Sequence, residues 1–135
     1  MPLNKSTDSL TRKQFDIDLE FGQQWEQVVD DIFCGVTTAE VKTENGKWQK
    51  TGNICIETES FGKPSGIHVT TSDIWVQNLV KDGKLVASII IPTDVLKEVI
   101  PDVSKGEVRG GDLMASKVIL LPLTKLFDRL RSVFS

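Results

Sequence analysis

Apolar positions recur along the chain with two periods, and each period predicts a different kind of element. Two segments show the helical period, residues 23–35 ("QQWEQVVDDIFCG") and residues 123–134 ("LTKLFDRLRSVF"). The apolar stripe of the first segment consists of Trp25, Val28, Val29, Ile32 and Phe33. These spacings of three and four residues are typical of an amphipathic helix, and Gly35 is well placed to end it. At about 100° per residue, Glu26 lies at the edge of this stripe and points toward the body of the domain.

Alternation of apolar and polar residues with a period of two predicts strands between these helices. The segments with this pattern are residues 15–21, about 37–44, 53–59, and a strand, Asp-Gly turn and strand over 73–92. The dipeptide Asn45-Gly46 is a strong turn signal. It predicts that the strands at 37–44 and 53–59 are joined as a hairpin.

The remaining segments add a short helix and two loops. Residues 93–100 ("TDVLKEVI") are expected to form a helix that Thr93 caps and Pro101 stops. Residues 61–71 and 102–112 are rich in glycine and polar residues and are expected to be loops. The order of a helix, a run of strands and further helices indicates the α+β class, with a mixed sheet flanked by helices.

Length and composition are those of an ordinary globular domain. The chain has 135 residues, of which 39% are hydrophobic and 26% charged. We expect residues 1–13 to be a flexible N-terminus and residues 14–135 to be a single domain. No apolar run approaches the ~18 residues of a membrane span, and the N-terminus does not resemble a secretory signal. Cys34 and Cys55 lack metal-type spacing and are expected to be buried thiols. A bacterial or viral protein in the cytoplasm fits these features.

The net charge of −3, from 16 basic and 19 acidic residues, restricts the expected partners. A non-specific nucleic-acid binder normally carries a basic surface, so this balance argues mildly against one. The argument weakens for a protein that uses carboxylates to bind a metal, because the metal would neutralise much of their charge.

Charged residues are concentrated on the two strands of the predicted hairpin. Because side chains two residues apart share a face of a strand, Glu40, Lys42 and Glu44 point one way. Glu57 and Glu59 share a face of the second strand. If the strands are neighbours, several carboxylates converge, and they would raise one another's pKa unless a cation lay between them. Oxygen ligands of this kind suit Mg²⁺ or Mn²⁺.

A solvated strand face is the alternative explanation for the same pattern. Glutamate and lysine often alternate on exposed strands, where cross-strand pairs between them are common. Three observations favour the metal site. Glu57 follows an apolar run, acidic residues outnumber basic ones on this face, and Glu26 is expected to point inward. In a metal site, Lys42 would orient the attacking water or offset the charge of a phosphodiester under attack.

An ordered series of short motifs resembles the PD-(D/E)XK nuclease superfamily, and within it a small, mostly phage-encoded branch. The motifs are "EVKTE" (40–44), "TGNICIETES" (51–60), "GKPSGI" (62–67) and "TTSDIWV" (70–76). The resemblance covers residues 22–75, about two-fifths of the chain. It implies an αβββαβ core. It also implies a helix acid at Glu26, a second-strand acid at Glu40 and a third-strand acid at Glu57, which together would bind Mg²⁺ or Mn²⁺.

The sequence departs from the family pattern after Glu57. Two residues later the family has a lysine, whereas this chain has Glu59. Either the catalytic lysine is Lys42 on the neighbouring strand, or Glu40 and Lys42 themselves form the acid-x-Lys motif. Both alignments keep Glu40, Lys42 and Glu57 at the centre of the site.

Several polar residues near these motifs are candidates for DNA contacts. Lys63 and Ser65 belong to the "GKPSG" loop, which could bind phosphate or simply form a turn. Lys47 and Lys50 flank Trp48 at the predicted hairpin tip, where cations beside an aromatic ring could bind nucleic acid, or the tip could be merely solvated. Glu44, Glu59 and Asp73 are secondary candidates. Asp73 would support the loop or pack.

These observations lead to two hypotheses about function. The first is a metal-dependent DNA endonuclease that leaves 5′-phosphate and 3′-hydroxyl ends, as the resemblance implies. It would act as a homodimer on double-stranded or branched DNA such as a four-way junction. The second is a non-catalytic nucleic-acid-binding or protein-binding module on a degenerate nuclease fold. The missing lysine after Glu57 and the acidic net charge favour the second.

Overall fold

The computed structural model describes residues 19–20, 22–110 and 114–134. The chain divides into two compact units, Met1–Gly35 and Val36–Ser135. In the first unit, residues 19–20 and 22–33 are helical and Gly35 follows with a φ of 74°. The helix predicted over 23–35 is therefore confirmed, including its end.

The strand predicted at residues 15–21 lies largely outside the described residues. Of that segment, only residues 19 and 20 are described, and both are helical, so the strand prediction is wrong there. Leu19 and Glu20 directly precede the helix. Each residue that extends an existing helix adds a backbone hydrogen bond, which outweighs a short alternation of apolar residues.

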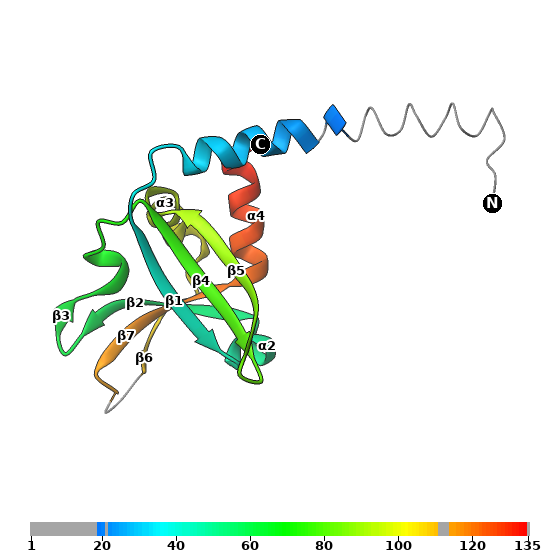
Figure 1. Cartoon of the computed structure of the whole chain (residues 1–135). Coiled ribbons are helices and arrows are strands. Elements are labelled where there is room, and N and C mark those ends of the chain that lie inside the picture. The colour runs from blue at the N-terminus through cyan, green and yellow to red at the C-terminus, as the bar shows by residue number, and fades with distance from the viewer. Residues whose placement is uncertain (1–18, 21, 111–113, 135) are drawn as a thin grey trace, which may run out of the picture. The chain divides into compact units, whose positions relative to one another are not determined.

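The second unit is a mixed α+β structure with two sheets (Figure 1). One sheet has the order β1-β4-β5 and the other the order β3-β2-β7-β6. β1 runs parallel to β4, and the other pairs are antiparallel. In chain order the elements are β1 (Ala39–Asn45), α2 (Lys47–Thr51), β2 (Asn53–Ser60), β3 (Lys63–Pro64), the 3-10 turn η1 (Gly66–His68), β4 (Ile74–Lys81), β5 (Lys84–Pro92), α3 (Thr93–Val103), β6 (Glu107–Gly110), β7 (Ser116–Pro122) and α4 (Leu123–Phe134).

The predicted hairpin between β1 and β2 is wrong, although both strands exist. The two strands belong to different sheets and are joined by α2. Gly46 and Gly52 bracket this single helical turn with φ values of 84° and 73°, a backbone region that suits glycine. The indole of Trp48 donates a 2.9 Å hydrogen bond to the carbonyl oxygen of Val80 and fixes the turn against the core.

Two further boundaries differ from the sequence prediction. α3 continues past Pro101 to Val103, because Val103 is buried in the core. The residue at its N-cap is Pro92, whereas the hydroxyl of Thr93 lies within hydrogen-bond distance of Ser72. The predicted loop at 102–112 contains strand β6. The Asp-Gly turn between β4 and β5 and the helix α4 are as predicted.

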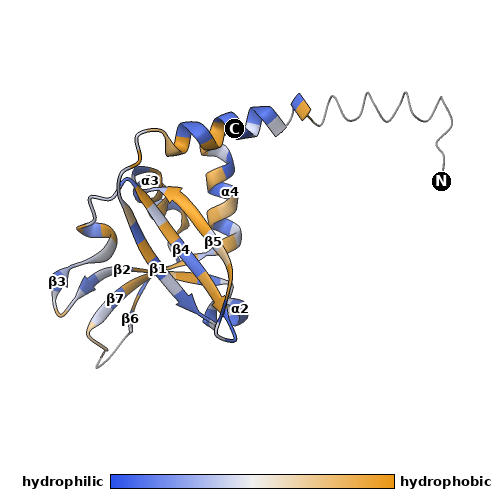
Figure 2. Ribbon diagram, in the orientation of Figure 1, coloured by the Kyte–Doolittle hydropathy of each residue, from blue (hydrophilic) through white to orange (hydrophobic). Residues whose placement is uncertain are grey.

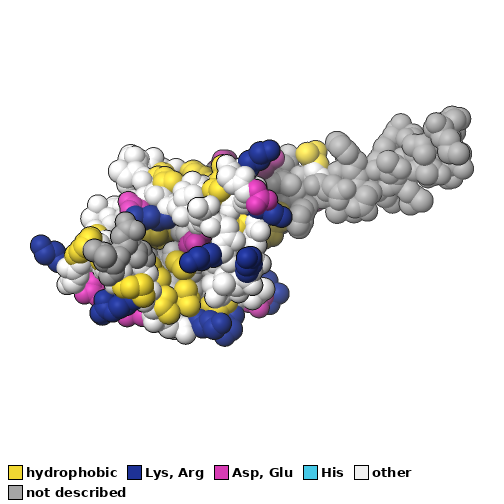
Figure 3. Space-filling model, turned by 90° about the horizontal axis from the view of Figure 1, so that it is seen from below, with side chains coloured by type: hydrophobic (Ala, Val, Ile, Leu, Met, Phe, Trp, Pro, Cys, Tyr) yellow, Lys and Arg dark blue, Asp and Glu magenta, His cyan; other side chains and the backbone are white. Residues whose placement is uncertain are grey.

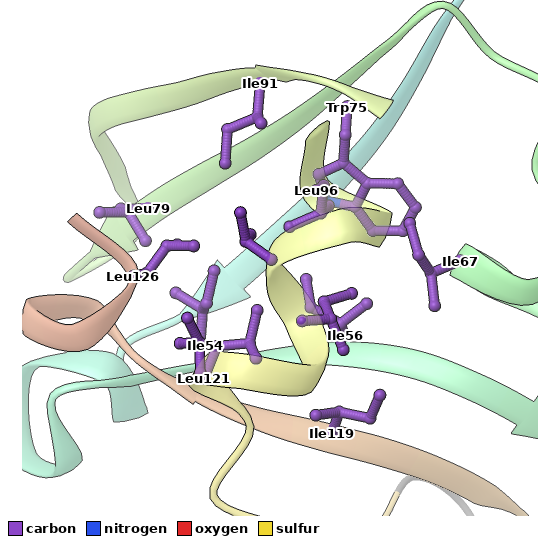
Figure 4. Close-up of a cluster of buried hydrophobic side chains, with 13 residues drawn as sticks. Ile54, Ile56, Ile67, Trp75, Leu79, Ile91, Leu96, Ile119, Leu121 and Leu126 are labelled. Carbon is purple, nitrogen blue, oxygen red and sulfur yellow. The ribbon is translucent and has the colours of Figure 1, made fainter. Parts of the chain in front are cut away.

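One hydrophobic core fills the space between the two sheets and the helices α3 and α4 (Figure 4). β2, α3 and α4 direct apolar side chains into this core, whereas hydrophilic and hydrophobic residues alternate along β1 (Figure 2), whose apolar residue Val41 is exposed. Each fully buried leucine or isoleucine contributes roughly 1.5–3 kcal/mol. The buried members are Ile54, Ile56, Ile67, Trp75, Leu79, Ile91, Leu96, Val99, Ile100, Val103, Ile119, Leu121 and Leu126.

Candidate functional site

Strand β1 directs its charged residues toward the interior of the second unit. Glu40, Lys42 and Glu44 are half-buried, whereas the residues between them, Val41 and Thr43, are exposed. In register, the three charged residues lie beside Trp75, Gln77 and Leu79 of β4, all of which are buried. The predicted alternation is therefore confirmed.

A cleft of about 250 Å³ opens next to this charged row, between β1 and β2. Lys42 and Glu44 line it from β1, and Cys55 and Glu57 line it from β2. Gln77 of β4 also lines the cleft, together with Thr43 and Val118. Two of the three central residues predicted from the sequence, Lys42 and Glu57, therefore share one cavity with the secondary candidate Glu44.

Two serine hydroxyls hold the carboxylate of Glu57. Ser65 Oγ donates to Glu57 Oε2 at 2.8 Å, and Ser116 Oγ donates to Oε1 at 3.1 Å. Neutral donors orient this carboxylate without cancelling its charge, and each oxygen keeps a lone pair for another ligand. Ser116 was missed by sequence reasoning because it lies 59 residues away on β7 and belongs to no motif.

Glycine at position 66 allows the "GKPSG" loop to approach Glu57 closely. Gly66 has a φ of 55°, and a Cβ atom there would lie 2.2 Å from the backbone carbonyl oxygen of Glu57. Both the positive φ and the lack of space for a Cβ atom require glycine at this position. The close approach brings Ser65 to the Glu57 carboxylate.

Glu40 lines a second pocket together with a residue of the same loop. That residue is Gly66, and the pocket has a volume of about 390 Å³. Lys42 Nζ lies 3.2 Å from Glu40 Oε1, and the two side chains are 36% and 35% exposed. At that exposure an ion pair contributes little to stability, typically ~0–1 kcal/mol. It does restrict where the Lys42 ammonium can lie, beside the cleft that contains Glu57.

Glu44 is held by a buried polar chain. Its Oε1 accepts hydrogen bonds from the Cys55 backbone N–H at 2.6 Å and from Gln77 Nε2 at 2.9 Å. Gln77 Oε1 in turn accepts from the Trp75 indole at 2.8 Å. Burial raises the pKa of Glu44, and the two hydrogen bonds offset part of the rise. A glutamine on the inward face of an apolar strand was the sequence signal that could have revealed this chain.

The thiol in the cleft is a poor nucleophile. Burial raises the pKa of Cys55, and the nearby Glu44 charge raises it further, while Lys47 opposes the rise. Cys55 therefore stays protonated at neutral pH, and because the thiolate is the reactive form, its thiol is a poor nucleophile. Cys34 is exposed, so the expectation that it is buried was wrong, and both cysteines are free.

The three predicted metal-binding acids are divided between the two units of the chain, with Glu40 and Glu57 in the second. Glu26 belongs to the first unit, where it is exposed on the helix. Among the described residues, no group of three or more Asp, Glu, His or Cys side chains is placed to hold a metal ion. Glu59 points away from the cleft and pairs with Lys117 at 3.0 Å, next to a different pocket.

Asp73 joins the beginnings of β1 and β4. Its Oδ2 accepts hydrogen bonds from the backbone N–H groups and hydroxyls of Thr37 and Thr38, at 2.9 to 3.2 Å. The hydrogen bond from the Thr37 backbone is the largest cause of a lowered Asp73 pKa. These contacts fix the segment before β1, and the predicted support of the loop at 61–71 stays a prediction.

The candidate DNA-binding lysines are exposed. Lys47 and Lys50 lie on α2 and Lys63 on β3. Trp48 points inward, so it is not presented for stacking on a base as the predicted hairpin tip would present it. Lysine and arginine side chains are scattered over the face shown in Figure 3, with acidic side chains between them.

Comparisons with known proteins give no relative for this chain: no family model, no curated protein and no solved structure matches it. None of the described helices combines the length and apolar character needed to cross a membrane.

Proposed function

We propose that the protein is a metal-dependent nuclease that hydrolyses phosphodiester bonds of DNA, built on a PD-(D/E)XK-like αβββαβ core. One observation carries the proposal. An oriented carboxylate, Glu57, and a lysine, Lys42, line the same cleft, and Glu40 binds that lysine from the same strand. A carboxylate and an ammonium group in one cleft match the needs of a phosphodiester under attack, which requires a cation site and compensation of negative charge.

The donor set fits Mg²⁺ or Mn²⁺. Mg²⁺ is usually held by one or two carboxylates, substrate phosphate oxygens and several waters, so three protein acids are not required. Glu57 has a free lone pair on each oxygen, because each accepts only one hydroxyl hydrogen bond. Glu57 and Glu40 are therefore the proposed ligands, with Glu26 as a further candidate. When bound, the cation would supply Lewis-acid stabilisation of the charge that develops on the phosphate.

The protein's own residues supply the remaining functions. Lys42, which pairs with Glu40, would offset the negative charge of the scissile phosphate. Ser65 and Ser116 keep the Glu57 carboxylate oriented before substrate arrives, which removes a reorganisation cost. Lys47, Lys50 and Lys63 are exposed cations that would bind the DNA backbone, and such contacts make affinity depend on salt.

A second function, DNA binding without cleavage, is favoured by Glu59. The family places a lysine at this position, whereas here Glu59 forms an ion pair with Lys117 outside the cleft. A degenerate site would keep the basic contacts and lose hydrolysis. Cleavage and binding must therefore be measured on the same samples.

Cutting both strands of a duplex or branched DNA requires two sites, so we propose that the protein acts as a homodimer. Its substrate would place it in the cytoplasm of a bacterial host, as a phage-encoded or bacterial protein.

The experiment is a cleavage assay on supercoiled plasmid, single-stranded DNA and a four-way junction, in Mg²⁺ or Mn²⁺ against EDTA. Lys42→Met and Glu57→Gln should each lose at least about 100-fold in rate while still binding DNA. If the wild type binds the junction tightly but cuts none of the three substrates in either metal, the binding function replaces the nuclease.

A further inference from the structure

The outer face of the β1-β4-β5 sheet is unusually apolar for a surface exposed to solvent. This face is turned toward the viewer in Figures 1 and 2, with α3 and α4 on the opposite side. Four large apolar side chains on it are exposed: Val41 at 56%, Leu85 at 62%, Val86 at 55% and Ile90 at 43%. Exposed apolar side chains gathered on one face in this way typically mark an interaction site.

The strand register arranges this face in rows, three of which lie between the row Ala39–Ile74–Pro92 and the β4–β5 turn. Val41, Val76 and Ile90 are register partners and form a first apolar row. Val80 pairs with Leu85, and the register shift beside Val80 places Val86 next to them in a second row, which is apolar on β4 and β5 and ends in Asn45 on β1.

A polar row separates the two apolar rows and crosses all three strands. Asn78 Nδ2 donates to Thr43 Oγ1 at 3.5 Å, and Ser88 Oγ donates to Asn78 Oδ1 at 2.6 Å. The three residues are register partners, so the row runs perpendicular to the strands.

The two ends of the face carry opposite charge. Asp73 precedes β4 and Asp94 lies in the first turn of α3, just after β5, so both acids lie beyond the first apolar row. The β4–β5 turn beyond the second apolar row carries Lys81 and Lys84 against the single acid Asp82. All five side chains are exposed.

We propose that this face binds the same face of a second copy of the chain, around a two-fold axis that runs along the polar row. Rotation about that axis reverses the strand direction of the partner. It places the first apolar row of each copy over the second apolar row of the other, and the acidic end over the basic end. The alternative axis, parallel to the strands, would bring like-charged ends together. A two-fold contact requires a self-complementary surface, and this face meets that condition in charge and in hydropathy.

The geometry also sets the expected strength of association. Strand spacing of about 4.8 Å and a rise of about 3.4 Å per residue give a face of roughly 15 by 20 Å. Two such faces would bury roughly 600 Å² in total, below the ~1,200–2,000 Å² of stable interfaces, so we expect a weak dimer that forms at roughly 100 μM or above. The proposed interface lies entirely on the β1-β4-β5 sheet. A dimer would serve the proposed nuclease, but the interface does not depend on catalysis.

Matched charge variants test the surface by sedimentation velocity, without DNA or metal. Ile90→Asp should weaken association at least about 100-fold, because the two-fold axis makes each substitution count twice and buries two charges. Val108→Asp is the control: Val108 is 44% exposed, close to Ile90 at 43%, but lies on β6 of the other sheet. The Val108→Asp variant should dimerise like the wild type.

In the proposed dimer, a residue on the two-fold axis faces the same residue of the second copy, which gives a sharper test. Ser88→Asp and Ser88→Lys should each be monomeric alone and should form a heterodimer when mixed. Three results would each overturn the proposal. They are a wild type that stays monomeric at several hundred micromolar, an equal loss of association in Val108→Asp and Ile90→Asp, and the absence of a heterodimer in the mixture. Glu57→Gln should still dimerise, so failure of the nuclease proposal is distinguishable from failure of this one.

Discussion

Replacing Gly66 with alanine tests how the "GKPSG" loop holds the Glu57 carboxylate. The new Cβ would lie 2.2 Å from the Glu57 carbonyl oxygen and 2.9 Å from its carbonyl carbon, so the loop or strand β2 must move. The atoms it meets are backbone atoms, which cannot swing aside as a flexible side chain would.

Two terms contribute to the expected cost of Gly66→Ala. Alanine in the left-handed region costs roughly 1–2 kcal/mol. Overpacking against a fixed neighbour typically adds about 1–3 kcal/mol. The sum, about 2–5 kcal/mol, is a large share of the ~5–15 kcal/mol by which domains are stable. We expect a fall in Tm of at least about 10 °C, and a loss of the geometry that brings Ser65 to Glu57.

Gly62→Ala supplies the control within the same loop. Gly62 also has a positive φ, of 77°, but no heavy atom lies within 4 Å of its Cβ position. It shares the conformational cost and lacks the clash. Thermal and urea denaturation of both variants separates the two terms. The explanation is refuted if Gly66→Ala unfolds no more easily than Gly62→Ala.

Three other substitutions have defined outcomes, each read by urea denaturation. Glu44→Gln keeps the acceptor oxygen for Cys55 and Gln77. Because burial raises the Glu44 pKa in the folded state, unfolding releases a proton between its ordinary pKa and the raised value, and wild-type stability falls as pH rises there. The variant should lack that slope. The pKa of Asp73 is lowered in the folded state, so its carboxylate stabilises the fold above its ordinary pKa, and this stabilisation is lost as pH falls through the folded value. Asp73→Asn should therefore be less stable than the wild type at neutral pH, and its stability should lack this dependence on acid pH. Trp48→Phe removes the hydrogen bond to Val80 and should cost about 1 kcal/mol, and an unchanged stability would contradict the role assigned to this indole.

The local pattern of the sequence was sufficient to predict which side chains share a face. The common direction of Glu40, Lys42 and Glu44 follows from a period of two, whereas the inward direction of this face depends on how the sheets pack. The helices over 22–33 and 123–134 follow in the same way from their apolar spacing.

Pairing between distant strands could not be derived from that pattern. Asn45-Gly46 is a turn signal, but Gly52 and the inward-pointing Trp48 convert the connection into a helical turn and send β2 to another sheet. For the same reason, none of the hydrogen-bond partners of Glu57 and Glu44 was predicted from the sequence. Ser116 and Gln77 come from strands whose order is set by core packing over the whole unit.

The most direct test of the central claim compares two glutamates on one strand. Glu57 lines the cleft with Lys42, whereas Glu59 pairs with Lys117 outside it. The measurement is the initial rate of supercoiled-plasmid cleavage in Mg²⁺ by the wild type, Glu57→Gln and Glu59→Gln. The account predicts a loss of at least about 100-fold for Glu57→Gln and a rate near that of the wild type for Glu59→Gln. Equal rates for all three proteins, or cleavage that persists in EDTA, would contradict it.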